Sequence, residues 1–151
     1  MYARTLRNLI LRVEHVGSTA VPDLLAKPIL DIDLVVRDNG IFREIVATLE
    51  AMGYTHERDQ TIPHREAFRT NSSARMEHHL YVCPASSNEL QRHIRFRDTL
   101  RRDERLRREY EALKVQFASR ANGSRALYAE LKQREGGPFV ERVLANYKPC
   151  T

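Results

Sequence analysis

Two aspartates inside an apolar segment are the residues whose type and spacing most clearly allow chemistry. Asp31 and Asp33 flank Ile32 within residues 29–36, a β-branched run with the strongest strand pattern in the sequence. Residues two apart in a strand point to one face, so the two carboxylates are expected to project together. Because burying like charges side by side is costly, the pair predicts a site for Mg²⁺, or Mn²⁺, with positions left open for water and phosphate. The alternative is a pair of exposed edge-strand acids that protect the sheet from aggregation.

A glycine–serine pair upstream of the aspartates could form the second half of such a site. Gly17 and Ser18 follow a short predicted strand over residues 13–16. Glycine lets the backbone approach a phosphate closely, and the exposed N–H groups and the serine hydroxyl can donate to its oxygens. A turn or helix-cap role is the alternative for Ser18. Lys27, in the connection to the aspartates, is either a phosphate ligand or an exposed loop lysine.

The elements that must position these residues change in character near Pro84. Turn residues and short apolar runs predict strands at 13–16, 29–36, 64–70 and 75–83, with a helix between Asn39 and Gly53. After Pro84 helix formers dominate, and Asn122-Gly123-Ser124 and Gly136-Gly137-Pro138 divide the helices. The predicted fold class is α+β, a mixed β-sheet packed against helices with a helical C-terminal half. Residues 1–151 are expected to form a single domain.

Most other residues with potentially reactive or metal-binding side chains are expected to have structural roles, or, for His78 and His79, to orient a substrate. Tyr110 and Phe117 belong to an apolar helical stripe and are predicted core residues, and Cys83 is a predicted small buried hydrophobe. His78 and His79 are neighbours in a strand, so they point to opposite faces and cannot readily share one metal ion. The remaining histidines are expected at the surface or in packing roles: His15, His56, His64 and His93.

Composition excludes several classes of protein. The 151 residues have a formal net charge of +5, and no apolar run is long enough to span a bilayer. The start of the chain has no clean signal-peptide core. Two cysteines form neither a disulfide framework nor a metal-site spacing. A reduced domain, located in the cytoplasm and without a membrane partner, is the expectation.

The charge excess is concentrated in one arginine-rich segment. Residues 92–108 contain eight arginines and three acids, and 8 − 3 = +5 equals the net charge of the whole chain. On a helical wheel Arg97 falls among apolar positions with Arg101 close by, so these cations must meet an anion. That anion is either a protein carboxylate or a bound phosphate. Aromatic residues are not interleaved with the arginines as in single-strand binders, so a nucleic acid is not expected as a partner.

The order of these motifs resembles a known family. Residues 14–22 (EHVGSTAVP) and 26–33 (AKPILDID) resemble the GrpB family and, more broadly, the nucleotidyltransferase superfamily related to DNA polymerase β. Later stretches resemble the GrpB family in order and spacing: HHLYV at 78–82, FRDTLR at 96–101, YEALK at 110–114 and YAELK at 128–132. The resemblance extends over nearly the whole chain and implies a nucleotidyltransferase-like fold.

The resemblance also implies a function. A Mg²⁺-dependent nucleotidyltransferase would use Asp31 and Asp33 as metal ligands and catalytic carboxylates, and Gly17-Ser18 to position a nucleoside triphosphate or another phosphate-bearing small molecule. Lys27 and the arginines 97 and 101 would offset phosphate charge. The acceptor is not implied. The alternative is a non-catalytic binding or folding-assistance module, as suggested for a similar domain fused to dephospho-coenzyme A kinase, which is then a candidate partner.

Active transferases of the superfamily generally use a third carboxylate on a neighbouring strand. Glu77 would share a face with His79 and Tyr81, so Glu77 is the predicted third metal ligand and His79 a substrate-contacting residue or base. Glu14 and Glu66 are the alternatives by strand position.

The sequence departs from the family pattern at two places near the site. Asp23 stands where a glycine is usual, and a segment that usually precedes the first strand is expected to be missing.

Overall fold

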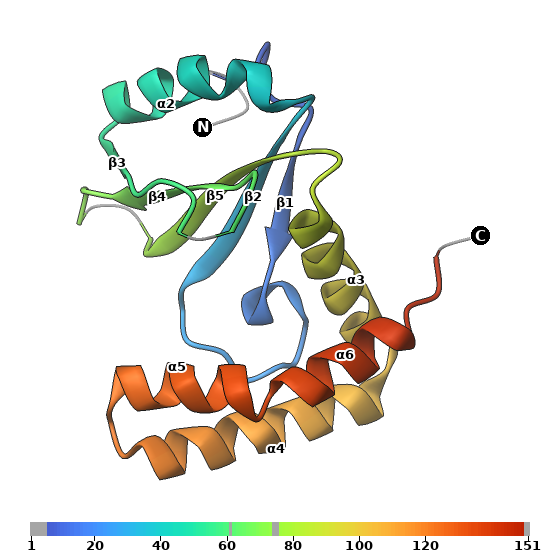
Figure 1. Cartoon of the computed structure of the whole chain (residues 1–151). Coiled ribbons are helices and arrows are strands. Elements are labelled where there is room, and N and C mark those ends of the chain that lie inside the picture. The colour runs from blue at the N-terminus through green and yellow to red at the C-terminus, as the bar shows by residue number, and fades with distance from the viewer. Residues whose placement is uncertain (1–5, 61, 74–75, 150–151) are drawn as a thin grey trace. The chain divides into compact units, whose positions relative to one another are not determined.

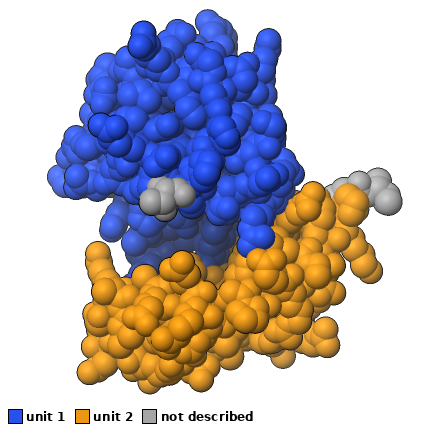
Figure 2. All heavy atoms as spheres, viewed as in Figure 1, with its two compact units in different colours: residues 1–20, 26–94 blue, residues 21–25, 95–151 orange. Residues whose placement is uncertain are grey.

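The chain forms two compact units, which are described separately. A computed structural model describes residues 6–60, 62–73 and 76–149. Residues 1–20 and 26–94 form the first unit, and residues 21–25 and 95–151 form the second (Figure 2). In the described residues, no helix is long and apolar enough to cross a membrane.

A mixed five-stranded sheet organises the described part of the first unit. The strands lie in the order β1-β2-β5-β4-β3 (Figure 1). β2 and β5 are parallel, and the other neighbouring pairs are antiparallel. The bounds are β1 Arg12–Val16, β2 Leu30–Val36, β3 Tyr54–His56, β4 Glu66–Thr70 and β5 His78–Pro84.

The alternation of side chains along β2 gives the sheet two different faces. On one face Leu34 and Val36 pack with Leu80 against Ile45 and Leu49 of helix α2 (Phe42–Ala51). Asp38 precedes this helix and accepts a hydrogen bond from the backbone of the 3₁₀ turn η2 (Asn39–Ile41).

On the opposite face the described core is smaller. There Val35 and Cys83 pack against Leu90, near the start of helix α3 (Asn88–Arg102), whose residues up to Ile94 belong to the first unit. Polar side chains therefore occupy part of this face.

Helices make up the described secondary structure of the second unit. These are the end of α3, α4 (Glu104–Ala121), α5 (Arg125–Arg134) and α6 (Gly137–Ala145). Asp103 and Ser124 accept hydrogen bonds from the first turns of α4 and α5, as N-cap residues do. The core of this unit consists of Val21, Leu24, Leu100, Leu106, Tyr110, Phe139 and Val143.

The predicted fold class is confirmed: the structure is α+β, with a mixed sheet and a helical C-terminal half. Tyr110, Phe117 and Cys83 are buried as expected. Strand β3 was not predicted, because three residues are too short for a periodic pattern and the strand is defined by pairing with β4. The single domain expected for residues 1–151 stays a prediction.

Asp23 lies in a backbone conformation that favours glycine. Asp23 has a φ of 62°, in the left-handed region that side chains with a Cβ adopt at a cost of about 1–2 kcal/mol. We expect Asp23→Gly to raise the free energy of unfolding by about 0.5–1 kcal/mol, since the extra flexibility of glycine in the unfolded chain offsets part of the relief. Chemical denaturation measures the change. Asp23→Ala keeps the Cβ but loses the polar side chain, so it should destabilise; a glycine variant less stable than the native chain would contradict the strain argument.

Candidate functional site

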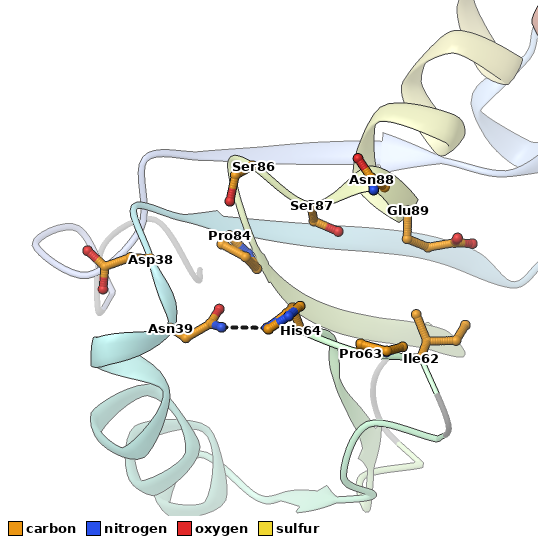
Figure 3. A pocket seen from close by; sticks show the side chains of 10 residues that line it. All are labelled: Asp38, Asn39, Ile62, Pro63, His64, Pro84, Ser86, Ser87, Asn88 and Glu89. Atoms are coloured by element: carbon orange, nitrogen blue, oxygen red, sulfur yellow. Dashed lines mark hydrogen bonds between the residues drawn. The ribbon is translucent and has the colours of Figure 1, made fainter.

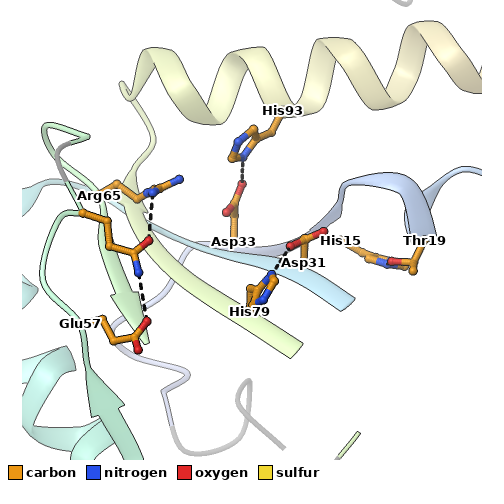
Figure 4. A network of polar contacts seen from close by, with 9 residues as sticks. His15, Thr19, Asp31, Asp33, Glu57, Arg65, His79 and His93 are labelled. Carbon is orange, nitrogen blue, oxygen red and sulfur yellow. Dashed lines mark hydrogen bonds and ion pairs between the residues drawn. The ribbon is translucent and has the colours of Figure 1, made fainter. Parts of the chain in front are cut away.

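The predicted acidic pair lies on the sheet face opposite α2. Asp31 and Asp33 alternate along β2 with the core residue Leu34 and share the face of Val35. In the parallel register with β5, Asp31 is paired with His79 and Asp33 with Tyr81, so these four side chains line one face. Figure 4 shows Asp31, Asp33 and His79. The structure therefore brings together the carboxylates and His79, as the sequence suggested.

Asp33 is a buried carboxylate with one oxygen in use. Its side chain is 1% exposed, and Oδ2 lies 2.9 Å from Nδ1 of His93 on α3. The other ring nitrogen of His93 lies 3.2 Å from Oε1 of Glu89, one helical turn earlier. Burial lowers the pKa of His93, but hydrogen bonds to Asp33 and Glu89, together with their charges, raise it to about 9. His93 is therefore an imidazolium at neutral pH that donates to both carboxylates.

Asp31 is arranged in the same manner but is more exposed. Oδ1 of Asp31 lies 2.9 Å from Nδ1 of His79, and this hydrogen bond is the main cause of the raised pKa of His79. Oδ2 faces Gly17, whose φ of 74° needs glycine, and a Cβ atom at Gly17 would lie 3.1 Å from Cγ of Asp31 and still closer to Oδ2. Glycine at this position thus lets the loop backbone pass directly against the carboxylate.

Each aspartate bonds to a histidine through one oxygen, and no hydrogen bond to its other oxygen is present among the described residues. Oδ1 of Asp33 is buried and has no hydrogen-bond partner among the described residues. A buried carboxylate oxygen without a partner is costly, and a cation between the two aspartates would satisfy it. The residues present therefore fit a divalent ion held by two carboxylates, each oriented by a histidine in the manner of metal sites.

The protein ligands for such an ion are limited. Among the described residues, no group of three or more histidine, cysteine, aspartate and glutamate side chains converges closely enough to hold a metal. A bound ion would depend on the two aspartates and on oxygens from water or phosphate. Mg²⁺ accepts this coordination, because it usually keeps several waters and binds through one or two carboxylates and substrate phosphates.

The structure separates the three candidates for a further carboxylate. Glu14 is paired with Asp33 in the β1–β2 register, so it lies on the same face, where it accepts a 2.8 Å hydrogen bond from Arg12. Glu77 is exposed just before β5, and its charge contributes to the raised pKa of His79. Glu66 is paired with Val82 and therefore lies on the face covered by α2, where it bonds to His56.

The residues predicted to contact phosphate are found in different surroundings. Ser18 begins a short 3₁₀ turn, η1 (Ser18–Ala20), directly after Gly17, and Lys27 is exposed in the segment leading to β2. Arg97 and Arg101 belong to the second unit, where their guanidinium groups lie 2.8 and 3.9 Å from Asp98. Asp98 is the protein carboxylate that sequence analysis left as one of two alternatives for these arginines.

Sequence analysis missed two residues on the sheet face that carries Asp31 and Asp33. His93, expected at the surface or in packing, is instead the partner of Asp33; its i,i+4 spacing from Glu89 was the available signal. Arg65, just before β4, is 8% exposed, and its guanidinium carbon lies 4.4 Å from the centroid of the Tyr81 ring. Burial raises the pKa of the Tyr81 hydroxyl, and the charge of Arg65 opposes that rise.

A separate pocket opens where the parallel strands β2 and β5 end. Its volume is about 410 Å³, and the side chains that line it are shown in Figure 3. They are Asp38, Asn39, Ile62, Pro63, His64, Pro84, Ser86, Ser87, Asn88 and Glu89. Glu89 also bonds to His93, so this pocket is joined to the buried Asp33 by a chain of two polar contacts.

The fold and the site define an α+β protein in which one face of a mixed sheet carries two histidine-bonded aspartates. The chain belongs to the GrpB family, because the model of the GrpB protein family matches residues 1–146. It is 38% identical over 140 residues to the UPF0157 protein BH1888 of Halalkalibacterium halodurans, covering 93% of this chain and 71% of that protein. It is 33% identical over 110 residues to the UPF0157 protein YqkA of Bacillus subtilis, but spans only 32% of that protein's length.

Two further comparisons concern a longer protein and a solved structure. The dephospho-CoA kinase of Mycobacterium tuberculosis is 29% identical over an alignment of 147 residues with gaps, which covers 82% of this chain and 36% of the kinase. The crystal structure of the conserved protein GrpB from Enterococcus faecalis matches with a TM-score of 0.80 at 28% identity, over 95% of this chain and 86% of that one. The fold is therefore that of a known GrpB structure.

Proposed function

We propose that this protein is a cytoplasmic nucleotidyltransferase that depends on Mg²⁺ or Mn²⁺ and acts on a nucleoside triphosphate and an acceptor of undefined identity. The observation that carries the proposal is the acidic pair: Asp31 and Asp33 share one face, and Oδ1 of the buried Asp33 lacks a protein partner among the described residues. The proposal includes placement of this fold in the nucleotidyltransferase superfamily.

The proposed chemistry is in-line attack of an acceptor oxygen on the α-phosphorus. The new P–O bond forms as the bond from the α-phosphorus to the oxygen bridging the β-phosphate breaks, pyrophosphate leaves, and the proton of the acceptor oxygen passes to solvent. When bound, the divalent ion supplies charge neutralisation and polarises the phosphoryl oxygens. Asp31 and Asp33 would hold the ion, while His79 and His93 fix the orientation of the two carboxylates. The backbone at Gly17 and the hydroxyl of Ser18 would donate hydrogen bonds to phosphate oxygens.

The proposal is tested by titrating Mg²⁺ and nucleoside triphosphates into the native protein, Asp31→Asn and Asp33→Asn. Loss of a carboxylate ligand should weaken Mg²⁺ affinity at least about 10-fold and weaken nucleotide binding in parallel. Glu44→Gln removes the same charge from an exposed position on α2 and should leave both affinities unchanged. Equal affinities for metal and nucleotide in the native chain and the two asparagine variants would overturn the proposal.

A non-catalytic module is the second candidate, and two observations favour it. The relatives include dephospho-CoA kinases, in which the matched region is about a third of the protein. In addition, both aspartates already bond to a histidine. A binding or folding-assistance role towards a dephospho-CoA kinase would not need the carboxylates. Refolding yield of such a kinase with and without this protein tests it: assistance retained by the Asp31→Asn/Asp33→Asn double variant supports the module, and no assistance by the native chain dismisses it.

A further inference from the structure

Arg65 is a buried cation that the proposed reaction does not yet use. The residue is 8% exposed, although arginine is almost never so buried unless it is paired. It stands at the end of the loop that precedes β4, next to His64, whose backbone has a φ of 61°. A non-glycine residue in this conformation is held there by its surroundings at a cost in free energy. The loop therefore fixes the position of the guanidinium group.

The partners of Arg65 do not neutralise its charge. Nε of Arg65 is buried and has no hydrogen-bond partner in the described part of the chain, and Nη2 lies 3.5 Å from the amide oxygen of Gln60. The ring of Tyr81 lies below the guanidinium group. Among the described residues, no carboxylate lies within ion-pair distance of Arg65. A buried charge without a counter-charge is costly, so an anion from outside the described protein atoms would stabilise Arg65.

Arg65 lies on the same face of the sheet as the acidic pair. The guanidinium group of Arg65 lies over the ring of Tyr81, and Tyr81 is paired with Asp33 in the β2–β5 register. Figure 4 shows Arg65 together with the two aspartates. Burial raises the pKa of Cys83 to about 12; the charge of Asp33 adds to this rise and that of Arg65 opposes it. Both charges therefore act on the same two residues of β5, Tyr81 and Cys83.

Two buried groups of opposite charge, each with an unsatisfied polar atom, thus flank Tyr81. A cation would stabilise the unpaired carboxylate oxygen of Asp33, and an oxyanion would stabilise the guanidinium group of Arg65. Metal-bound phosphate has both charges in one ligand. Guanidinium groups bind phosphate oxygens through parallel charge-assisted hydrogen bonds, which a neutral or cationic ligand cannot accept in the same way.

We propose that Arg65 is an anion-binding residue for the phosphate chain of the ligand, held on the Tyr81 ring so that its N–H groups meet phosphate oxygens beside the Asp31–Asp33 pair. This inference deepens the proposed function. Only the metal-dependent part of the inference rests on the proposed function. The substrate class that this role favours is a polyphosphate ester with at least two linked phosphates. One phosphate would then meet the aspartates through a cation, and another would meet the guanidinium group directly.

Inorganic pyrophosphate is the probe, and calorimetric titration of the native chain, Arg65→Gln and Arg43→Gln is the measurement. We expect pyrophosphate to bind the native protein in the presence of Mg²⁺ and to bind more weakly in EDTA. Arg65→Gln should lower the pyrophosphate affinity about 10- to 100-fold in each of the two buffers. Arg43→Gln removes the same charge from an exposed position of α2 and should bind as the native chain does. Unchanged pyrophosphate affinity in Arg65→Gln, or no binding by the native protein in either buffer, would overturn the inference.

Two further arms separate this inference from the proposed function and from misfolding. Asp33→Asn should lose the Mg²⁺ enhancement but keep binding in EDTA, so a failed metal site leaves the role of Arg65 intact. In the native protein, the Nε–H resonance of Arg65, assigned with Arg65→Lys, should shift when pyrophosphate is added. A resonance that stays fixed while pyrophosphate binds would contradict the inference even if Arg65→Gln does not fold.

Discussion

Gly17→Ala is expected to disable the acidic pair while leaving the chain folded. Two effects add at this position. The φ of 74° costs an alanine about 1–2 kcal/mol of folding free energy. The new Cβ would also collide with the carboxylate of Asp31, so Asp31 must rotate and its hydrogen bond with His79 must break. We therefore expect a lower free energy of unfolding together with a loss of Mg²⁺ affinity as large as that of Asp31→Asn.

Another glycine of the first unit provides a matched control for Gly17→Ala. Gly53 has a φ of 89°, and no atom lies within 4 Å of a Cβ built there. Gly53→Ala therefore introduces the backbone strain without the collision. It should lower the free energy of unfolding by about as much as the backbone strain of Gly17→Ala does, and leave Mg²⁺ affinity unchanged. Denaturation and metal titration of the two variants separate strain from displacement of Asp31. Native Mg²⁺ affinity in Gly17→Ala would show that the close approach of the loop to Asp31 has no role in the site.

Phe139→Ala is expected to give the largest loss of stability among these variants. Phe139 is 4% exposed in the core of the second unit, and its ring stacks on Tyr110 with centroids 5.4 Å apart and planes 3° apart. Phe96 meets Phe139 edge-on at 6.5 Å. Removing a buried phenyl ring costs about 3–5 kcal/mol, because the transfer free energy is lost and a cavity remains. Denaturant unfolding measures this loss, and Val115→Ala, at an exposed position of α4, should change stability by less than about 0.5 kcal/mol.

Phe139→Ala also tests the expectation that residues 1–151 form one domain. In a single cooperative domain, a core substitution in one unit lowers the opening free energy of amides throughout the chain. Hydrogen exchange should then accelerate equally for the slowest amides of β2, in the first unit, and of α4, in the second. Acceleration confined to α4 would show that the two units unfold independently and that the single-domain prediction is wrong.

The predictable features of this protein were those that depend on residues near one another in sequence. Alternation in residues 29–36 placed Asp31 and Asp33 on one face, as observed in β2. The glycine–proline group at 136–138 divided the last two helices, as observed between α5 and α6. Local steric rules and the periods of strands and helices determine these features without the rest of the fold.

The partners of the acidic pair could not be read from local patterns. The β1–β2 register brings Glu14 opposite Asp33, and the β4–β5 register turns Glu66 to the other face. Strand order and register depend on packing between distant segments, and a shift of one residue would exchange the two faces. The sequence alone therefore narrowed the further carboxylate to three residues, and only strand pairing placed Glu14 and Glu66 on opposite faces of the sheet.

The sequence by itself thus determined the α+β class, the helix breaks before and after α5, and the shared face of Asp31 and Asp33, because each follows from short-range periodicity and turn chemistry. Only the tertiary structure decided that His93 bonds to Asp33 and that Arg65 is buried on Tyr81 without a carboxylate among the described residues. Both facts depend on which helix and which loop cover the sheet face. The burial that makes an unpaired oxygen or guanidinium costly, and therefore informative, exists only once those segments have packed.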